Sequence, residues 1–94
     1  MKILWTVSAE QDRADIVDFI AQDNPLAAIR MDENFSAAVG RLAEHPLLGR
    51  AGQIPSTREL IPYESYRLVY KVRADTVWIL TLVHIARLWP PTRS

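Results

Sequence analysis

The segment from Tyr63 to Pro90 constrains the fold of this chain more than any other. Bulky apolar residues alternate with other residues in two runs, and Ala74 and Asp75 separate these runs. Alternation with this period predicts two antiparallel strands joined by a turn. If the turn is centred on Ala74 and Asp75, one face of the hairpin is almost wholly apolar, which is typical of a face packed against a core. That face carries Tyr66, Leu68, Tyr70, Val72, Val77, Ile79, Thr81 and Val83.

The opposite face of the hairpin carries the residues that can do chemistry. Arg67, Lys71 and His84 interrupt the apolar ladder there, and His84 is one step beyond Leu82 and diagonal to Arg67. A turn lengthened to Arg73 through Thr76 keeps this register, whereas a three-residue turn sends Arg67 and His84 to opposite faces. We therefore predict that a guanidinium and an imidazole project from the same face.

Length and charge indicate one small globular domain. The 94 residues, interpreted as a single domain over 1–94, are 49% hydrophobic, and 11 basic residues balance 11 acidic ones. A chain without net charge lacks the positive field expected of an autonomous nucleic-acid-binding protein. There is no cysteine, which excludes disulfides, thiolate metal sites and cysteine nucleophiles.

We predict neither a cofactor nor a metal. Both histidines lack a partner at ligand spacing, so the sequence gives no support for a zinc site. The first residues form an apolar run that is too short for a signal peptide or a membrane span. We therefore expect a soluble cytoplasmic protein without membrane contacts.

An initial strand at residues 2–7 is followed by two predicted helices. Ser8 begins the first helix with the spacing of a capping box, and helical periodicity continues to about residue 22. Asn24 is the predicted cap of a second helix over residues 25–44, with proline at its first position. The short connection predicts an antiparallel helical hairpin. The second helix has a periodic apolar stripe of Ala28, Met31, Phe35, Ala38, Val39 and Leu42.

Glycine and proline occur without periodicity from residue 46 to 56, which predicts an ordered surface loop. A short strand at residues 57–61 and a turn at 62–65 then lead into the hairpin. The predicted order is β-α-α-β-β-β. The predicted fold class is α+β, with the helical hairpin packed on one face of a mostly antiparallel four-stranded sheet.

The chain also resembles a known family over essentially its whole length. The pieces that carry the resemblance are, in order, DNPLAAIR, LAEHPLLGRAG, TREL, YRLVYKV and VWILTLVHIARLWP. In combination they resemble the RelE/ParE superfamily of bacterial toxins from type II toxin-antitoxin modules. The resemblance implies a growth-arresting cytosolic toxin that a cognate antitoxin neutralises, and operator DNA that is bound only through the antitoxin.

The resemblance leaves two targets open. RelE-like members cleave mRNA within the translating ribosome, whereas ParE-like members have the same fold, lack that catalytic set and inhibit DNA gyrase. Arg67 matches the third-strand arginine of the ribonuclease branch, and His84 lies near its last-strand histidine or tyrosine. Where some ribonucleases carry a glutamate, before the second strand, this chain has Ala51, Gly52 and Gln53. This departure, together with the ending HIARLWP, favours gyrase inhibition.

The sequence is therefore compatible with three functions. The first is inhibition of DNA gyrase by binding alone. The second is ribosome-dependent RNA cleavage, with Arg67 as the cation near the phosphate, His84 as base or acid, and Arg87 as a phosphate contact. The third is an inactive co-repressor whose partner is the antitoxin.

The same residues also have structural interpretations. Arg67 would pair with Glu59 or Glu64, and His84 would end its strand. Arg87 and Trp89 would anchor the tail across the sheet edge. The outward faces of the two helices carry a mixed charge pattern that indicates solvated surface, at Asp12, Arg13, Asp15, Asp18, Arg30, Asp32 and Glu33.

Overall fold

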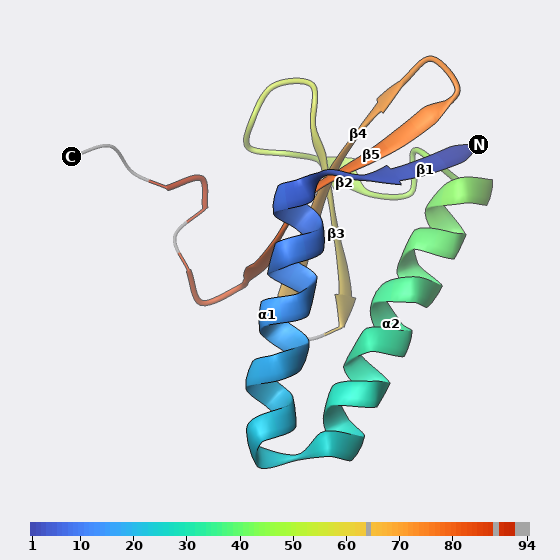
Figure 1. The fold of residues 1–94 in the computed structure, drawn as a ribbon. Coiled ribbons are helices and arrows are strands. Elements are labelled where there is room, and N and C mark those ends of the chain that lie inside the picture. The colour runs from blue at the N-terminus through green and yellow to red at the C-terminus, as the bar shows by residue number, and fades with distance from the viewer. Residues whose placement is uncertain (64, 88, 92–94) are drawn as a thin grey trace.

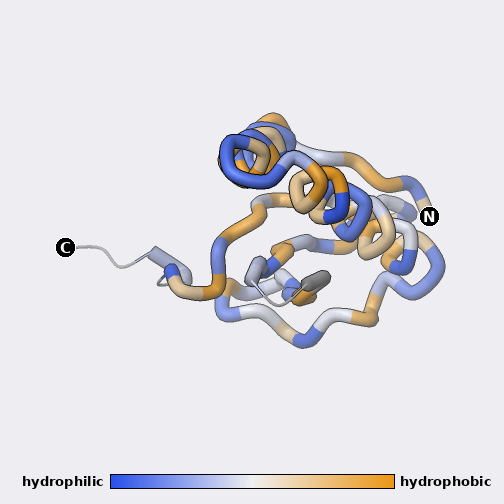
Figure 2. Tube along the Cα trace, turned by 90° about the horizontal axis from the view of Figure 1, so that it is seen from below, coloured by the Kyte–Doolittle hydropathy of each residue, from blue (hydrophilic) through white to orange (hydrophobic). Residues whose placement is uncertain are grey.

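Helices and sheet form two layers (Figures 1 and 2). The computed structural model describes residues 1–63, 65–87 and 89–91, without the side chains of Pro62 and Tyr63. Figure 1 shows the two helices side by side on one face of the sheet, which confirms the predicted α+β fold. The elements are β1 (Lys2–Trp5), α1 (Val7–Asp23), α2 (Pro25–Glu44), β2 (Arg50–Ala51), β3 (Arg58–Tyr63), β4 (Tyr66–Arg73) and β5 (Thr76–His84).

In the described part of the chain, the sheet has the strand order β1-β5-β4-β3-β2 and contains five strands, one more than predicted. β1 pairs in parallel with β5, and the other pairs are antiparallel. The additional strand is β2, which lies in the predicted loop and pairs Arg50 with Glu59 and Ala51 with Arg58. Two residues are too few to leave an alternating pattern, so periodicity could not reveal this strand.

The first helix begins earlier than predicted. Its cap is Thr6 rather than Ser8, and the Thr6 hydroxyl accepts a hydrogen bond from the Ala9 N–H at 3.0 Å. The same hydroxyl donates to the Leu80 carbonyl at 3.1 Å, so a contact with β5 decides where the helix starts. The predicted cap of α2 is confirmed, because the Asn24 side chain accepts from the Ala27 N–H at 3.1 Å.

The core lies between α2 and the sheet. The buried residues of α2 are the six of the predicted stripe. Four of them, Met31, Phe35, Val39 and Leu42, belong to one buried cluster with residues of β4 and β5. Phe35 is fully buried and packs edge to face against Tyr66 at 5.9 Å between ring centroids. Burial of a phenylalanine side chain stabilises a fold by about 1.5–3 kcal/mol, so this stripe fixes the helical layer over the sheet.

The turn of the hairpin is the predicted one. Arg73 pairs with Thr76, which leaves Ala74 and Asp75 as the turn, and Val72 pairs with Val77 as expected. Ala74 has φ 55°, in the left-handed region that a side chain disfavours. None of the helices in the described ranges is both long and apolar enough to cross a membrane.

Candidate functional site

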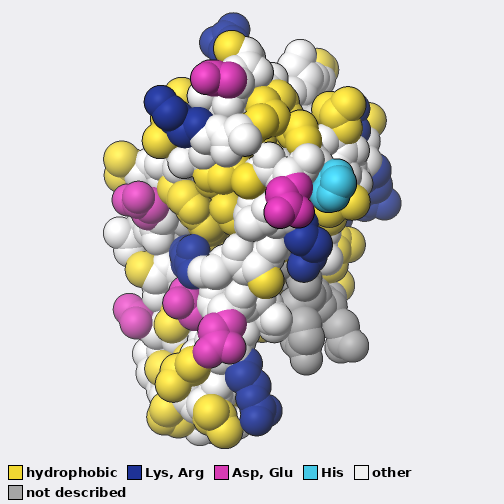
Figure 3. All heavy atoms as spheres, turned by 90° about the vertical axis from the view of Figure 1, so that its right-hand side faces the viewer, with side chains coloured by type: hydrophobic (Ala, Val, Ile, Leu, Met, Phe, Trp, Pro, Cys, Tyr) yellow, Lys and Arg dark blue, Asp and Glu magenta, His cyan; other side chains and the backbone are white. Residues whose placement is uncertain are grey.

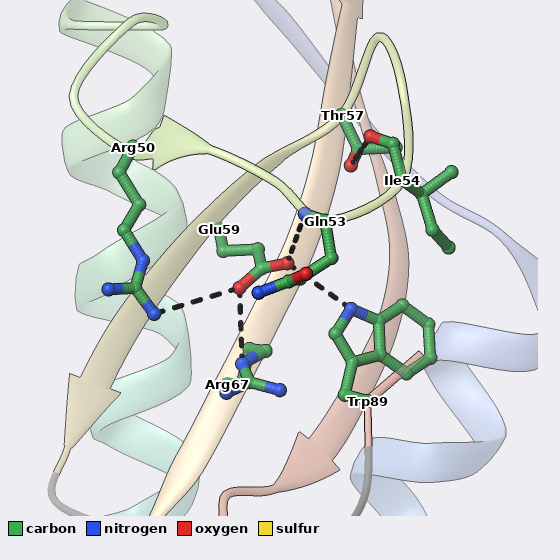
Figure 4. Close-up of polar contacts among 7 residues, drawn as sticks. All are labelled: Arg50, Gln53, Ile54, Thr57, Glu59, Arg67 and Trp89. Atoms are coloured by element: carbon green, nitrogen blue, oxygen red, sulfur yellow. Dashed lines mark hydrogen bonds and ion pairs between the residues drawn. The ribbon is translucent and has the colours of Figure 1, made fainter. Parts of the chain in front are cut away.

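A buried carboxylate lies on the sheet face away from the helices. The Glu59 side chain is 2% exposed, and its Oε1 lies 3.2 Å from Arg67 Nε and 3.9 Å from Arg50 Nη2. Its Oε2 accepts hydrogen bonds from the Gln53 N–H at 3.0 Å and from the Trp89 indole N–H at 3.2 Å. We call these five residues the Glu59 cluster (Figure 4). The cluster joins β2, β3, β4, the loop after β2 and the C-terminal segment.

Arg67 is held by the Glu59 carboxylate. Its side chain is 16% exposed, and its Nε is buried and makes no hydrogen bond to any described residue. The ion pair with Glu59 is therefore the interaction that compensates this end of the guanidinium. The predicted pairing with Glu59 is confirmed, whereas Glu64 lies outside the described residues. Arg67 is not an exposed cation awaiting a phosphate.

Arg67 and His84 do not share a face, so that prediction is wrong. The register is as predicted near the turn, but a bulge between the pairs of Val69 and Tyr70 makes Leu80 an extra residue on β5. Beyond the bulge, His84 pairs with Tyr66. Paired residues project from the same face, so His84 lies on the helix-facing side, opposite to Arg67.

Two side chains of the first helical region bind the bulge. Thr6 donates to the Leu80 carbonyl at 3.1 Å. The Asp12 carboxylate accepts from the Thr81 hydroxyl at 2.6 Å and from the Leu82 N–H at 3.1 Å. Asp12 therefore holds β5 in the shifted register and is not ordinary solvated surface, contrary to the sequence interpretation.

His84 and Arg87 lie at the rim of a hollow between α1 and β5. Both side chains are exposed. The hollow has a volume of about 310 Å³, and Phe19, which is 71% exposed, forms part of its wall. Its lining consists of Asp12, Asp15, Ile16, Phe19, Tyr66, Leu82, Val83, His84 and Arg87.

The imidazole of His84 is oriented by its own turn and by an aromatic neighbour. Its Nδ1 accepts a hydrogen bond from the Ala86 N–H at 3.0 Å. The Tyr66 ring packs edge to face against it at 5.2 Å between centroids. The structure therefore brings His84 and Arg87 together and leaves Arg67 on the other face.

A buried tyrosine ties β4 to the loop before β2. The Tyr70 hydroxyl donates to the Pro46 carbonyl at 2.8 Å and accepts from the Gly49 N–H at 2.9 Å. Burial raises the pKa of Tyr70 above its usual 10, although the bond from Gly49 and the charge of Arg58 oppose the shift. The prediction that Tyr66 and Tyr70 belong to the core is confirmed by exposures of 9% and 0%.

Within the described ranges, no group of three or more histidine, cysteine or acidic residues is placed to hold a metal ion. In the loop after β2, the Gln53 N–H donates to Glu59 Oε2 at 3.0 Å, and the Gln53 residue is exposed.

Sequence reasoning missed the role of Asp12, because one acidic residue in a mixed-charge helix looks like any other. It did predict that Trp89 anchors the tail on the sheet. It did not predict the partner, Glu59, which is 30 residues distant in the chain. Arg13, also interpreted as solvated, binds Asp32 at 2.7 Å and lies 5.0 Å above the Trp5 ring.

Comparison with known proteins gives the family. Residues 3–89 match the family described as ParE toxin of type II toxin-antitoxin system, parDE. A protein named putative toxin Y4kP from Sinorhizobium fredii is 40% identical over 90 residues, which is 95% of this chain and 93% of that protein. Toxin RelE2 of Caulobacter vibrioides is 38% identical over 87 residues, which is 93% of this chain and 98% of that protein.

Solved structures share the fold. A chain titled "Chromosomal ParDE TA system from P. aeruginosa" has a TM-score of 0.80 at 21% identity, over 90% of this chain and 96% of that one. A YoeB/ParE toxin from Agrobacterium tumefaciens has a TM-score of 0.63 at 18% identity, over 89% of this chain and 98% of that one. Identities this low bear on the fold alone. The sequence match over residues 3–89 shows that the chain belongs to the ParE toxin family of type II toxin-antitoxin systems.

Proposed function

We propose that this toxin arrests bacterial growth by binding DNA gyrase, without a chemical step of its own, and that a cognate antitoxin neutralises it in the cytoplasm. The observation that carries the proposal is the separation of Arg67 and His84 by the sheet. Cleavage of RNA by its own 2′-hydroxyl needs a base, a cation and an acid around one phosphate. Here the strand arginine and the histidine face opposite ways.

The ion pair between Arg67 and Glu59 supports the same proposal. Its Nε lies 3.2 Å from the buried Glu59 carboxylate, so a phosphate at this face would compete with an internal anion. The loop that carries a glutamate in some ribonucleases supplies no carboxylate here, since it reads Ala51, Gly52 and Gln53. The α2 side of the surface mixes acidic, basic and apolar side chains (Figure 3), which is not the single-sign surface of a protein that binds nucleic acid on its own.

One observation favours the ribonuclease as a second candidate. His84 and Arg87 are both exposed and line one hollow. An imidazole and a guanidinium that line the same hollow are two of the groups that RNA cleavage requires. In that case the working pair would be His84 and Arg87, without Arg67.

Two assays on the purified protein separate these functions. If the proposal holds, the toxin inhibits supercoiling by gyrase and leaves mRNA intact on translating ribosomes, and its induction in cells triggers filamentation and DNA damage signalling before protein synthesis falls. Cleaved messages with unaffected gyrase would overturn it in favour of the ribonuclease.

A double variant makes the same test more specific. His84→Ala combined with Arg87→Ala removes the exposed candidate pair, and we expect it to abolish cleavage if the protein is a ribonuclease. Arg67→Ala is a poor probe, because it leaves Glu59 buried without its ion pair, a loss that costs roughly 3–5 kcal/mol in buried pairs. Failure of the toxin to arrest growth in the absence of an antitoxin would favour the inactive co-repressor.

A further inference from the structure

The sheet face away from the helices has an exposed part near the turn of the hairpin. β1 lies beside β5 there (Figure 1), and two rows of side chains cross the neighbouring strands β1, β5 and β4. Val77, between the two rows, is buried in the core on the helix side, so the rows project from the opposite face. In the strand order β1, β5, β4, the rows are Lys2, Thr76 and Arg73, and then Leu4, Trp78 and Lys71.

All but one of these side chains reach the surface. Thr76 is buried at 9% exposure, Leu4 is 38% exposed, and the others are exposed or half-buried. Farther along the same face of β4, Val69 is 1% exposed. This face is therefore more open at the turn than at Val69. We call its open part the turn-side patch, which consists of Lys2, Leu4, Lys71, Arg73 and Trp78.

The turn-side patch carries positive charge that the described part of the chain does not neutralise. None of Lys2, Lys71 and Arg73 forms an ion pair with a described residue. The carboxylate of Asp75, in the adjacent turn, accepts a hydrogen bond from the Thr76 hydroxyl at 3.2 Å and opposes three cations with one charge. Negative charge is concentrated on α1, which has five acidic residues and one basic residue although the whole chain is neutral. A patch with a positive surplus attracts an acidic partner.

The arrangement of the patch is that of a protein-binding surface. Trp78 has Leu4 on one side and Lys71 on the other, so an apolar and a cationic side chain flank an aromatic one. Interfaces between proteins combine aromatic and arginine anchors with a polar rim. Three cations in a chain without net charge are few for a surface that follows a nucleic-acid backbone. An acidic polypeptide segment that also offers an apolar side chain fits the patch better.

We propose that gyrase binds the turn-side patch through an acidic segment of the gyrase protein, with an apolar side chain against Trp78 and Leu4. This inference rests on the proposed function and adds to it the contact surface and the charge of the partner. Surfaces that hold DNA are positively charged because they neutralise phosphates, and they would repel the patch. The patch therefore selects a part of gyrase that does not contact DNA.

Binding of the toxin to the purified gyrase holoenzyme without DNA tests the role of charge. Lys71→Gln combined with Arg73→Gln removes two positive charges from a half-buried and an exposed side chain, so the fold should be retained. We expect the Kd for gyrase and the concentration that half-inhibits supercoiling to rise by about tenfold or more, within the range measured for charge pairs at interfaces. Raising the salt concentration should weaken binding of the unmodified toxin more than binding of this variant.

The matched control is Arg30→Gln combined with Arg41→Gln, which removes the same charge from exposed positions of α2. Neither arginine forms an ion pair with a described residue, and the Kd for gyrase should be unchanged. Competition on the unmodified toxin tests the chemistry of the partner. Poly-L-glutamate should displace gyrase from the toxin, and a short DNA duplex should not.

The possible failures are distinguishable. Equal binding of gyrase by the folded Lys71→Gln/Arg73→Gln variant would overturn the inference and leave the proposed function standing. Binding that requires DNA, or that a DNA duplex competes away while poly-L-glutamate does not, would overturn it in favour of a nucleic-acid contact. An unmodified toxin that neither binds nor inhibits gyrase would remove the proposed function and this inference together. The competition experiment uses the unmodified toxin, so it decides the matter even if the double variant fails to fold.

Discussion

The two halves of the β4–β5 hairpin are held in register by different interactions. Near the turn, Arg73 pairs with Thr76 and the pairs follow in step, so local geometry fixes the alignment. Beyond Leu80 the alignment is shifted by one residue, and the contacts that fix it come from Thr6 and Asp12, about 70 residues earlier in the chain. One half of a hairpin can thus be aligned by local geometry and the other half by tertiary contacts. In this hairpin the tertiary contacts determine the face from which His84 projects.

We call the part of the hairpin between the turn and Leu80 the straight half, and the part beyond Leu80 the bulged half. The straight half has a second support in Tyr70, whose hydroxyl accepts a hydrogen bond from the Gly49 N–H in the loop before β2. We expect the largest effect from Gly49→Ala, because an added Cβ would lie 2.8 Å from the Glu59 carbonyl and from Tyr70 Cε1 and Oη. Overpacking of this kind should lower the free energy of unfolding by about 3 kcal/mol. Urea unfolding at constant m-value measures it.

Gly40→Ala is the matched control for that substitution. A Cβ at Gly40 meets nothing within 4 Å, and in a helix interior alanine is more stable than glycine by about 0.5–1 kcal/mol. If Gly49→Ala is as harmless as Gly40→Ala, the loop does not support the straight half.

The bulged half is tested by Asp12→Ala. This change removes the acceptor of the Thr81 hydroxyl and the Leu82 N–H, and we expect a loss of about 2 kcal/mol. Hydrogen exchange should accelerate at Leu82 and not at Val77, which lies in the straight half. Asp15→Ala alters an exposed carboxylate of the same helix and should change stability by less than about 0.5 kcal/mol. Uniform acceleration along β5 would contradict separate control of the two halves.

The features that the sequence predicts are those set by neighbouring residues, and the features that it does not predict are those set by distant ones. The α2 stripe, its Asn24 cap and the turn at Ala74 depend on neighbours within a few residues, and all three are confirmed. The bulge at Leu80 depends on Asp12, and the burial of Arg67 depends on Glu59 and the tail. The alternation of residues along β5 cannot reveal a bulge that is stabilised by a residue of α1. The fold was therefore predictable, whereas the mutual placement of Arg67 and His84 was not.

Tyr70 lies where the two halves meet, and its hydroxyl gives a pH-dependent test. Burial raises the pKa of Tyr70 above 10 in the folded state, so folding favours the neutral phenol. The stability from this group is complete below pH 10 and is lost as pH rises from there towards the folded pKa. Tyr70→Phe should cost about 1.5 kcal/mol at pH 7, because Gly49 N–H and the Pro46 carbonyl lose their partner. The gap between the two proteins should narrow above pH 10 in urea unfolding, and parallel curves would refute the link.

The smallest expected effect concerns the turn, the local device of the straight half. Ala74 has φ 55°, where a side chain costs roughly 1–2 kcal/mol and glycine costs almost nothing. Glycine also makes the unfolded chain more flexible, which offsets part of the gain. Ala74→Gly should therefore raise the free energy of unfolding by about 0.5 kcal/mol, with exchange slowed at Val72 and Val77 and unchanged at Leu82. An equal effect on Leu82 would mean that the turn also governs the alignment beyond the bulge, and that Thr6 and Asp12 follow the register instead of setting it.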